Sequence, residues 1–105
     1  MNRSEILDTA KQYVTVDRAN THGDAESNFA LIATYWSAHL DIYVDAADVA
    51  IMMALFKLAR AKGNMGNPEN WIDGCGYMAC GGEIATEADN PKPTPMKAIR
   101  LGESI

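Results

Sequence analysis

The chain has 105 residues, of which 48% are hydrophobic and 22% charged, and its formal net charge is −5. A chain of this length builds a single domain, and its apolar content excludes disorder over most of its length. The negative charge argues against direct binding to a nucleic-acid backbone or to an anionic membrane, because both need a basic protein surface. Small phosphorylated ligands remain open, since one or two local cations or a metal ion suffice for them.

The start of the chain lacks the apolar segment of a signal peptide. The longest purely apolar run covers residues 49–56, far shorter than the ~20 residues that span a bilayer. Cys75 and Cys80 are five residues apart, which fits neither a metal-ligand pair nor a disulfide framework. The sequence therefore predicts a cytoplasmic protein with reduced thiols and no membrane partner.

Two helices are expected in the first part of the chain. The first runs from about Ser4 to Val16, with Ser4 as its N-cap and apolar residues at helical spacing. The second begins near Asp24, which can cap it, and carries large apolar residues along one stripe, from Phe29 to Leu40.

The third expected helix is capped by Asp45, runs to Lys62 and is ended by Gly63. Between Asp48 and Lys57 it is apolar almost all round. A helix of this kind is buried on several sides, either in a bundle or in an oligomer interface. Because so small a bundle has little capacity to surround it, we expect a homo-oligomer.

Asn67 and Pro68 form a typical helix start, with Asn as N-cap and Pro at the first helical position. This fourth helix is expected to continue to about Thr86. Three closely spaced prolines follow, so residues 88–105 are expected to form an extended or mobile tail. The sequence thus predicts an all-α fold, a four-helix bundle-like single domain over residues 1–87 with a Pro-rich C-terminal tail.

Asp73 lies on an otherwise apolar face of the fourth helix, one turn before Tyr77. Desolvating an unpaired carboxylate costs several kcal/mol, so this position has to be explained by a partner. One interpretation is a structural ion pair with Lys57, Arg60 or the loop backbone. The other is a ligand or metal site.

Asp45 and Asp48 are three residues apart, a spacing that suits either a shared divalent cation or the positive end of a helix dipole. Asp48 also shares its helical face with Met52 and Leu55, which predicts that it points inward.

Lys57 and Arg60 are three residues apart on another face. They can hold phosphate oxygens, pair with Asp73, or simply stabilise the C-terminal turn of their own helix. Trp71 lies in the first turn of the fourth helix, where it can stack on a base or be part of the core.

The string His22-Gly23-Asp24 precedes the second helix, and Asn28 lies in its first turns. A cap and a surface histidine explain these residues without function, but the same loop can present His22, Asp24 and Asn28 to a polar ligand near a helix N-terminus. The fourth helix also contains four glycines, which indicate close packing against another helix or, less often, a ligand. They are Gly74, Gly76, Gly81 and Gly82.

Short strings between Ile6 and Ile84 carry a resemblance. They are His22-Gly23-Asp24, Asn28-Phe29, Trp36, Asp48-Val49-Ala50, Met53, Lys57, Arg60 and Trp71-Ile72-Asp73 with Gly76-Tyr77. Together they resemble a family of small phage and prophage proteins of unassigned function. That family is distantly similar to the MazG-like, all-α nucleotide pyrophosphohydrolases.

The resemblance to MazG-like enzymes implies Mg²⁺ held by carboxylates of two adjacent helices, typically an E-x-x-E and an E-x-x-D pair. The metal activates water while a nucleoside triphosphate is cut to the monophosphate and pyrophosphate. Carried onto this chain, Asp45 and Asp48 would stand for one pair, Asp73 for a later carboxylate, and Glu26 for an acidic residue early in the second helix. The chain has no complete E-x-x-E pair, so this motif is incomplete.

These observations predict a phage-type, MazG-like protein that binds a nucleotide or related phosphorylated small molecule in the cytoplasm of an infected or lysogenic bacterium. If it is an enzyme, we expect pyrophosphohydrolysis with Mg²⁺ or Mn²⁺, with Asp73 and Asp48 catalytic and, together with Glu26, metal-binding. The expected ligand contacts are His22, Asp24, Asn28, Lys57, Arg60, Trp71 and Tyr77. Alternatives are a non-catalytic counter-defence protein that sequesters a nucleotide signal, and an inhibitor of a host defence protein.

Overall fold

The computed structural model describes residues 1–17 and 25–87, and all regular structure in these ranges is helical. The elements are α1 (Arg3–Gln12), the π-helical turn η1 (Tyr13–Asp17), α3 (Ala25–Leu40), α4 (Ala46–Gly63) and α5 (Pro68–Thr86). The predicted all-α fold is confirmed. The expectations for His22, for Asp24 and for a tail over 88–105 concern residues outside these ranges. Among the described helices, none is long and apolar enough to cross a membrane.

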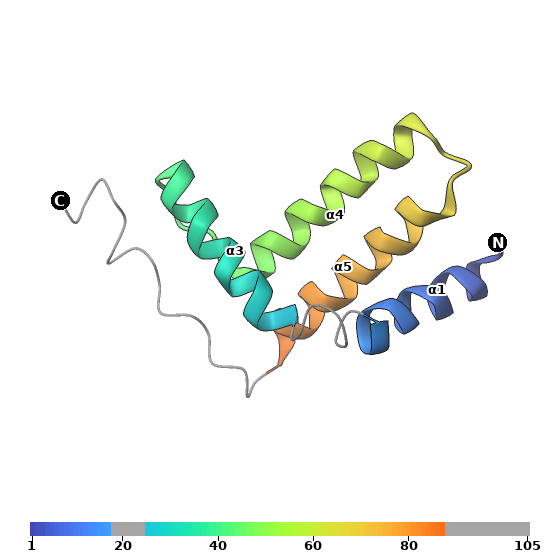
Figure 1. Cartoon of the computed structure of the whole chain (residues 1–105), viewed down its shortest axis with the longest axis horizontal. Coiled ribbons are helices and arrows are strands. Elements are labelled where there is room, and N and C mark those ends of the chain that lie inside the picture. Colours follow the sequence, from blue (N-terminus) through green and yellow to red (C-terminus); the bar gives the residue numbers. More distant parts are fainter. Residues whose placement is uncertain (18–24, 88–105) are drawn as a thin grey trace.

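The helices form a hairpin with an arm (Figure 1). Helices α4 and α5 run antiparallel, and α5 lies between α4 and α1. Helix α3 crosses the beginning of α4 and extends away from the hairpin as an arm. The hairpin is thus covered by α1 along one side and by α3 at one end, which leaves much of α4 on the outside.

Two helix starts follow the predicted capping residues. The Asp45 side chain accepts from the Asp48 N–H at 2.8 Å, and Asp48 accepts from the Asp45 N–H at 3.1 Å, which completes a capping box. Asn67 accepts from the Glu69 N–H at 3.1 Å and caps α5 ahead of Pro68.

The first helix differs from the expectation at both ends. Its N-cap is Asn2 rather than Ser4, because Asn2 and Glu5 satisfy each other's backbone N–H groups at 2.8 and 3.1 Å. At its other end the chain changes to the wider π-helical turn from Tyr13 onward. The apolar spacing of this segment does not distinguish a π turn from an α turn.

Two glycines of α5 allow close contact with α4 and with η1, as the number of glycines in this helix predicts. A Cβ atom at Gly81 would lie 2.7 Å from the Ala50 Cβ, and one at Gly76 would lie 2.9 Å from Val14 Cγ1. At Gly82 nothing lies within 4 Å. Gly81 therefore sets the contact between α4 and α5, and Gly76 sets the contact between α5 and η1.

The core lies where α3 crosses the hairpin. Val49 of α4, which belongs to this core cluster, and Ile72 of α5, which lies outside it, are the largest fully buried side chains. The core cluster is made of small and medium residues, with larger ones packed against it. It contains Phe29, Ala33, Val44, Ala46, Val49 and Ala50, and its partly buried neighbours are Ile32, Trp36, Met53, Tyr77, Cys80 and Ile84.

A buried serine fixes the corner between α3 and α4. The Ser37 hydroxyl donates to the Val44 carbonyl oxygen at 3.0 Å and accepts from the Val44 N–H at 2.9 Å. Both backbone groups of Val44 are therefore satisfied inside the core by one side chain. Asp41, with φ 55°, makes the turn that brings the chain back.

Asp48 does not point inward, and that prediction is wrong. Asp48, Met52 and Leu55 are all exposed on the outer side of α4. The error arises because α4 is apolar on two sides, so hydrophobicity alone does not tell which side faces the core.

We predict that Gly81→Ala destabilises the fold although alanine is the better helix former. The added methyl group meets Ala50 and forces the two helices apart, at a cost of about 1–3 kcal/mol of unfolding free energy. Gly82→Ala is the matched control and should stabilise by up to about 1 kcal/mol. Urea unfolding of both variants measures the difference. Equal effects of the two substitutions would contradict the close approach.

A second prediction concerns alkaline pH. Burial first, and then the carboxylates of Asp45 and Asp48, raise the pKa of the Tyr43 phenol above its ordinary value of 10.0. The stabilisation is fully present below the unfolded pKa and is lost as the pH rises through the higher folded pKa. The unfolding free energy should therefore fall more steeply in wild type than in Tyr43→Phe above pH ~10. Parallel pH profiles for the two proteins would refute this.

Candidate functional site

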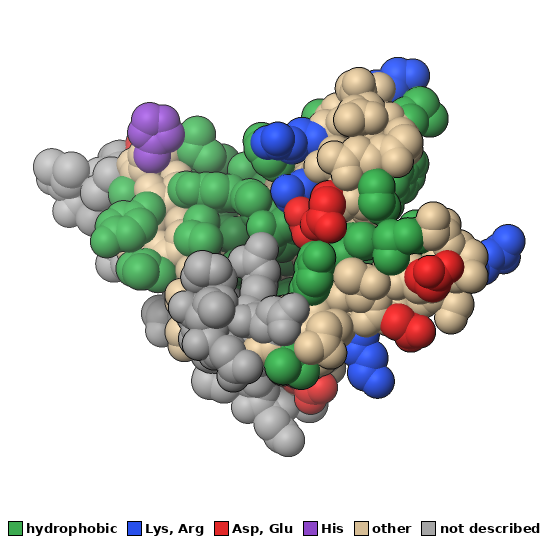
Figure 2. Space-filling view, turned by 45° about the vertical axis from the view of Figure 1, so that its right-hand side comes forward, with side chains coloured by type: hydrophobic (Ala, Val, Ile, Leu, Met, Phe, Trp, Pro, Cys, Tyr) green, Lys and Arg blue, Asp and Glu red, His purple; other side chains and the backbone are tan. Residues whose placement is uncertain are grey.

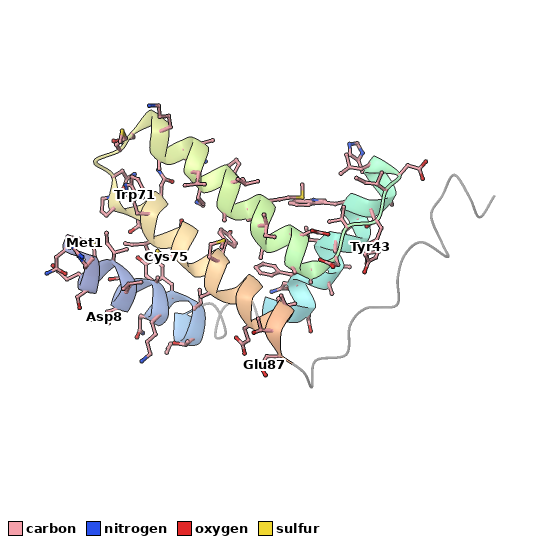
Figure 3. The ribbon with its side chains drawn as sticks, turned by 180° about the vertical axis from the view of Figure 1, so that it is seen from behind. Met1, Asp8, Tyr43, Trp71, Cys75 and Glu87 are labelled. Atoms are coloured by element: carbon pink, nitrogen blue, oxygen red, sulfur yellow. The ribbon has the colours of Figure 1, made fainter. Side chains whose placement is uncertain are left out.

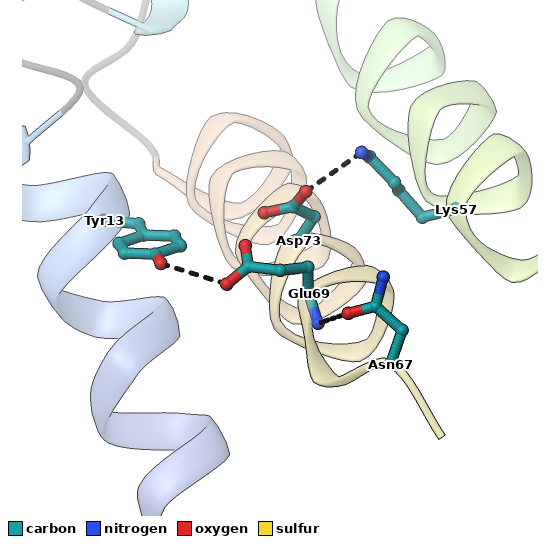
Figure 4. A network of polar contacts seen from close by, with 5 residues as sticks. All are labelled: Tyr13, Lys57, Asn67, Glu69 and Asp73. Carbon is teal, nitrogen blue, oxygen red and sulfur yellow. Dashed lines mark hydrogen bonds and ion pairs between the residues drawn. The ribbon is translucent and has the colours of Figure 1, made fainter. Parts of the chain in front are cut away.

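One face of α5 carries the polar residues that stand out from the hydrophobic surroundings. Glu69, Asp73 and Tyr77 follow one another at intervals of four residues, so their side chains share one side of the helix. Figure 4 shows Glu69 and Asp73 next to each other, with Tyr13 on one side and Lys57 of α4 on the other. We use the name α5 polar face for Tyr13, Lys57, Glu69, Asp73 and Tyr77 together.

Asp73 is paired with Lys57 across the hairpin. The Lys57 Nζ lies 2.9 Å from Asp73 Oδ2, and the two side chains are only 18% and 23% exposed. The two helices are in ordinary van der Waals contact at this level, since a Cβ atom at Gly74 would lie 3.9 Å from the Lys57 Cβ. Of the two interpretations of Asp73, the ion pair with Lys57 is present, and it brings together two of the predicted site residues.

Glu69 joins the face through a contact that the sequence does not reveal. The Tyr13 hydroxyl donates to Glu69 Oε1 at 3.3 Å, across 56 positions of sequence. From the sequence, Glu69 could have been included in the site because it lies four residues before Asp73, on the same side of the helix. No local pattern indicates Tyr13, because its role depends on how η1 packs against α5.

Aromatic rings border the polar face. The Tyr77 ring lies 6.1 Å from that of Phe29 in a tilted arrangement. Lys57 Nζ and Arg60 Cζ lie 5.9 and 5.4 Å from the centre of the Phe56 ring, within reach of a cation–π attraction. In Figure 2, acidic and basic side chains lie next to a hydrophobic surface that extends over α3.

Two predicted site residues lie elsewhere. Trp71 is two residues from both Glu69 and Asp73, about 200° around the helix, so it lies on the opposite side of α5. Figure 3 shows it at the α4–α5 loop, where its Nε1 donates to the Met65 carbonyl oxygen at 2.9 Å. Asp48 is nine residues before Lys57 on α4, or ~13 Å along the helix axis, and it faces outward.

The remaining predicted residues belong to the beginning of α3 and the segment before it. Asn28 is partly buried and lies next to Phe29. Glu26 lies on α3, but the structure describes only its backbone, and His22 and Asp24 are outside the described residues. The structure therefore brings together part of the predicted site, namely the predicted ligand contacts Lys57 and Tyr77 and the predicted catalytic residue Asp73.

The predicted metal ligands do not converge among the residues that the structure describes. Asp73 pairs with Lys57, whereas Asp48 lies ~13 Å before Lys57 along the α4 axis and takes part in the capping box at the start of its own helix. Within residues 1–17 and 25–87 there is no group of three or more His, Cys, Asp or Glu side chains that could hold a metal ion. Glu69 and Asp73 are two carboxylates on one helix face, which is fewer ligands than the two-helix set implied by the resemblance.

The described residues define a small all-α protein whose hairpin carries one charged face bordered by aromatic rings. Residues 5–85 match the model of the family described as "Domain of unknown function (DUF6378)", and the chain belongs to this family. No solved structure matches the chain.

Two phage proteins are similar to this chain. The Gene 55 protein of Mycobacterium phage L5 is 38% identical over 73 residues, which are 69% of this chain and 47% of that protein. The Gene 55 protein of Mycobacterium phage D29 is 32% identical over 88 residues, which are 84% of this chain and 58% of that protein. The chain spans about half the length of these curated relatives. The predicted resemblance to small phage proteins of unassigned function is confirmed.

The Lys57–Asp73 pair gives a prediction for stability. Because both side chains are largely buried, Asp73→Asn or Lys57→Met leaves a charge without its partner and should cost about 1–3 kcal/mol of unfolding free energy. The double variant should cost clearly less than the sum of the two single variants. Lys11→Met, which removes an exposed cation from α1, should change stability by no more than ~0.5 kcal/mol. Additive single effects in urea unfolding would show that the pair is not coupled.

Proposed function

We propose that the protein binds a nucleotide or a related phosphorylated small molecule at the α5 polar face, with Lys57 and Arg60 contacting phosphate oxygens. The observation that carries the proposal is the Lys57–Asp73 pair itself. It places a cation and a carboxylate, 2.9 Å apart and mostly buried, beside the Phe56 ring and one helical turn before Tyr77. Charged groups in such surroundings are typical of sites that recognise a polar ligand.

The neighbouring residues suit the parts of a nucleotide. Arg60 is exposed and lies one turn after Lys57, so both can face one phosphate group, which arginine binds with two parallel hydrogen bonds. Asp73 and Glu69 can accept hydrogen bonds from ribose hydroxyls or base amino groups. Tyr77 supplies an aromatic ring one turn beyond Asp73, where a base can pack.

The finer assignment rests on the sequence resemblance to MazG-like pyrophosphohydrolases, which supports a nucleotide as the ligand. Turnover would need Mg²⁺ or Mn²⁺ to polarise a phosphoanhydride and activate water. The second candidate is a non-catalytic protein that sequesters a nucleotide signal, and the similarity to two phage proteins favours a role of this kind during infection. Both candidates use the same cations.

A thermal-shift screen tests the proposal. Purified protein is heated with nucleoside mono-, di- and triphosphates and cyclic dinucleotides, with and without Mg²⁺ or Mn²⁺. A ligand at a hundred times its dissociation constant should add about 2.7 kcal/mol to the unfolding free energy and raise the melting temperature measurably. The Lys57→Met and Arg60→Met variants should not show this ligand-induced rise in melting temperature. Lys62→Met is the matched control, since it removes a cation from the opposite side of the same helix end, and it should keep the increment.

Chromatography of the ligand after denaturation separates the two candidates. A ligand cleaved in the presence of a divalent cation would support the hydrolase, and a ligand recovered intact would support sequestration. If no compound in the screen raises the melting temperature, or if Lys62→Met loses the increment as fully as Lys57→Met, the proposed site is wrong.

A further inference from the structure

The side of α4 turned away from α5 is hydrophobic and uncovered. Between Asp48 and Arg60, every exposed residue on this side is apolar. Leu55 is 57% exposed, Leu58 56% and Ile51 51%. We define the outer face of α4 as Ile51, Met52, Leu55, Leu58 and Ala59.

A continuous apolar stripe of this kind is uncommon on a surface that stays in water. Single exposed hydrophobic residues are normal, but a contiguous group of them marks an interaction surface. The stripe lies on a rigid helix with a capping box at its start, so it presents a fixed shape. It is also separate from the α5 polar face, because Lys57 points across to Asp73.

Opposite charges stand at the two ends of the outer face. Asp48, Leu55 and Lys62 are spaced by seven residues, so they fall on one line along the helix. Asp48 and Lys62 are both exposed. Leu55 lies midway between them, and it is also midway between Ile51 and Ala59 and between Met52 and Leu58.

This arrangement of charged and apolar residues is complementary to a second copy of itself that runs in the opposite direction. If a second α4 lies antiparallel with Leu55 against Leu55, each Asp48 meets a Lys62, and the apolar residues meet one another. A two-fold interface needs such self-complementarity, because the same patch serves both subunits. In a parallel arrangement Asp48 would meet Asp48 and Lys62 would meet Lys62, which is repulsive.

We propose that the protein forms a two-fold symmetric homodimer in which α4 packs antiparallel against α4 of a second copy, with Leu55 on the symmetry axis. Two ion pairs between Asp48 and Lys62 close the ends of the interface. The antiparallel direction also sets the positive end of each helix dipole beside the negative end of the other.

The molar mass of the full chain in solution tests the dimer. Light scattering and sedimentation equilibrium over a range of concentrations should show a dimer for wild type. Leu55→Glu places two carboxylates against each other on the axis and should weaken dimerisation by roughly 100-fold or more. Leu7→Glu is the matched control, because Leu7 on α1 is 59% exposed and lies away from α4. It should keep the wild-type dimer.

Disulfide trapping tests the direction of pairing, in a background with Cys75→Ala and Cys80→Ala. A mixture of Ile51→Cys and Ala59→Cys chains should form mainly the mixed disulfide, since these positions face each other only in the antiparallel arrangement. Predominant 51–51 and 59–59 disulfides would overturn the proposal. A wild-type chain that stays monomeric, as when its own residues 88–105 cover the outer face, would also overturn it, as would a Leu55→Glu protein that dimerises like wild type.

Discussion

The close contact between α4 and α5 is the constraint on which the rest of the structure depends. With no side chain at Gly81, the backbone of α5 approaches Ala50 so closely that even a methyl group would collide. This contact fixes the register of the hairpin, and the register brings Lys57 level with Asp73. A hairpin with a wider spacing or a shifted register would leave both charges in hydrophobic surroundings without partners. An unpaired buried charge keeps its desolvation penalty and loses the attraction of its partner, so such a hairpin would be less stable.

Because α5 packs on one side of α4, the two sides of α4 differ in their surroundings. One side supplies Lys57 to the α5 polar face, where the Lys57–Asp73 pair, the carboxylate of Glu69 and aromatic rings lie together. The other side is apolar between Asp48 and Lys62, and its large side chains, among them Ile51, Leu55 and Leu58, are exposed. In the proposed dimer, the proposed ligand site of each subunit remains open while the outer face of α4 is covered. Ligand binding and assembly then use different residues of one helix.

Much of the fold could be predicted because capping chemistry is local. Asp45 and Asn67 mark the starts of α4 and α5, since a helix start needs side-chain acceptors within three residues. The prediction of Ser4 as the first N-cap was wrong because Asn2 forms a capping box with Glu5. The inward direction of Asp48 could not be decided, since α4 is apolar on both sides. In the site, the charge on Asp73 predicted a partner and included Lys57 among the alternatives. The contact of Tyr13 with Glu69 depends on tertiary packing of η1, which local sequence does not encode.

The corner at Ser37 has a consequence for how the arm behaves. One hydroxyl holds both the donor and the acceptor of Val44, so moving Ser37 away from Val44 lengthens both hydrogen bonds together. Opening the corner removes both at once and leaves three buried polar groups seeking water. These two hydrogen bonds therefore oppose opening of the corner between α3 and α4 more strongly than a single bond would. A molecule that approaches the hydrophobic surface of the arm meets a helix whose angle to the hairpin is held from inside the core.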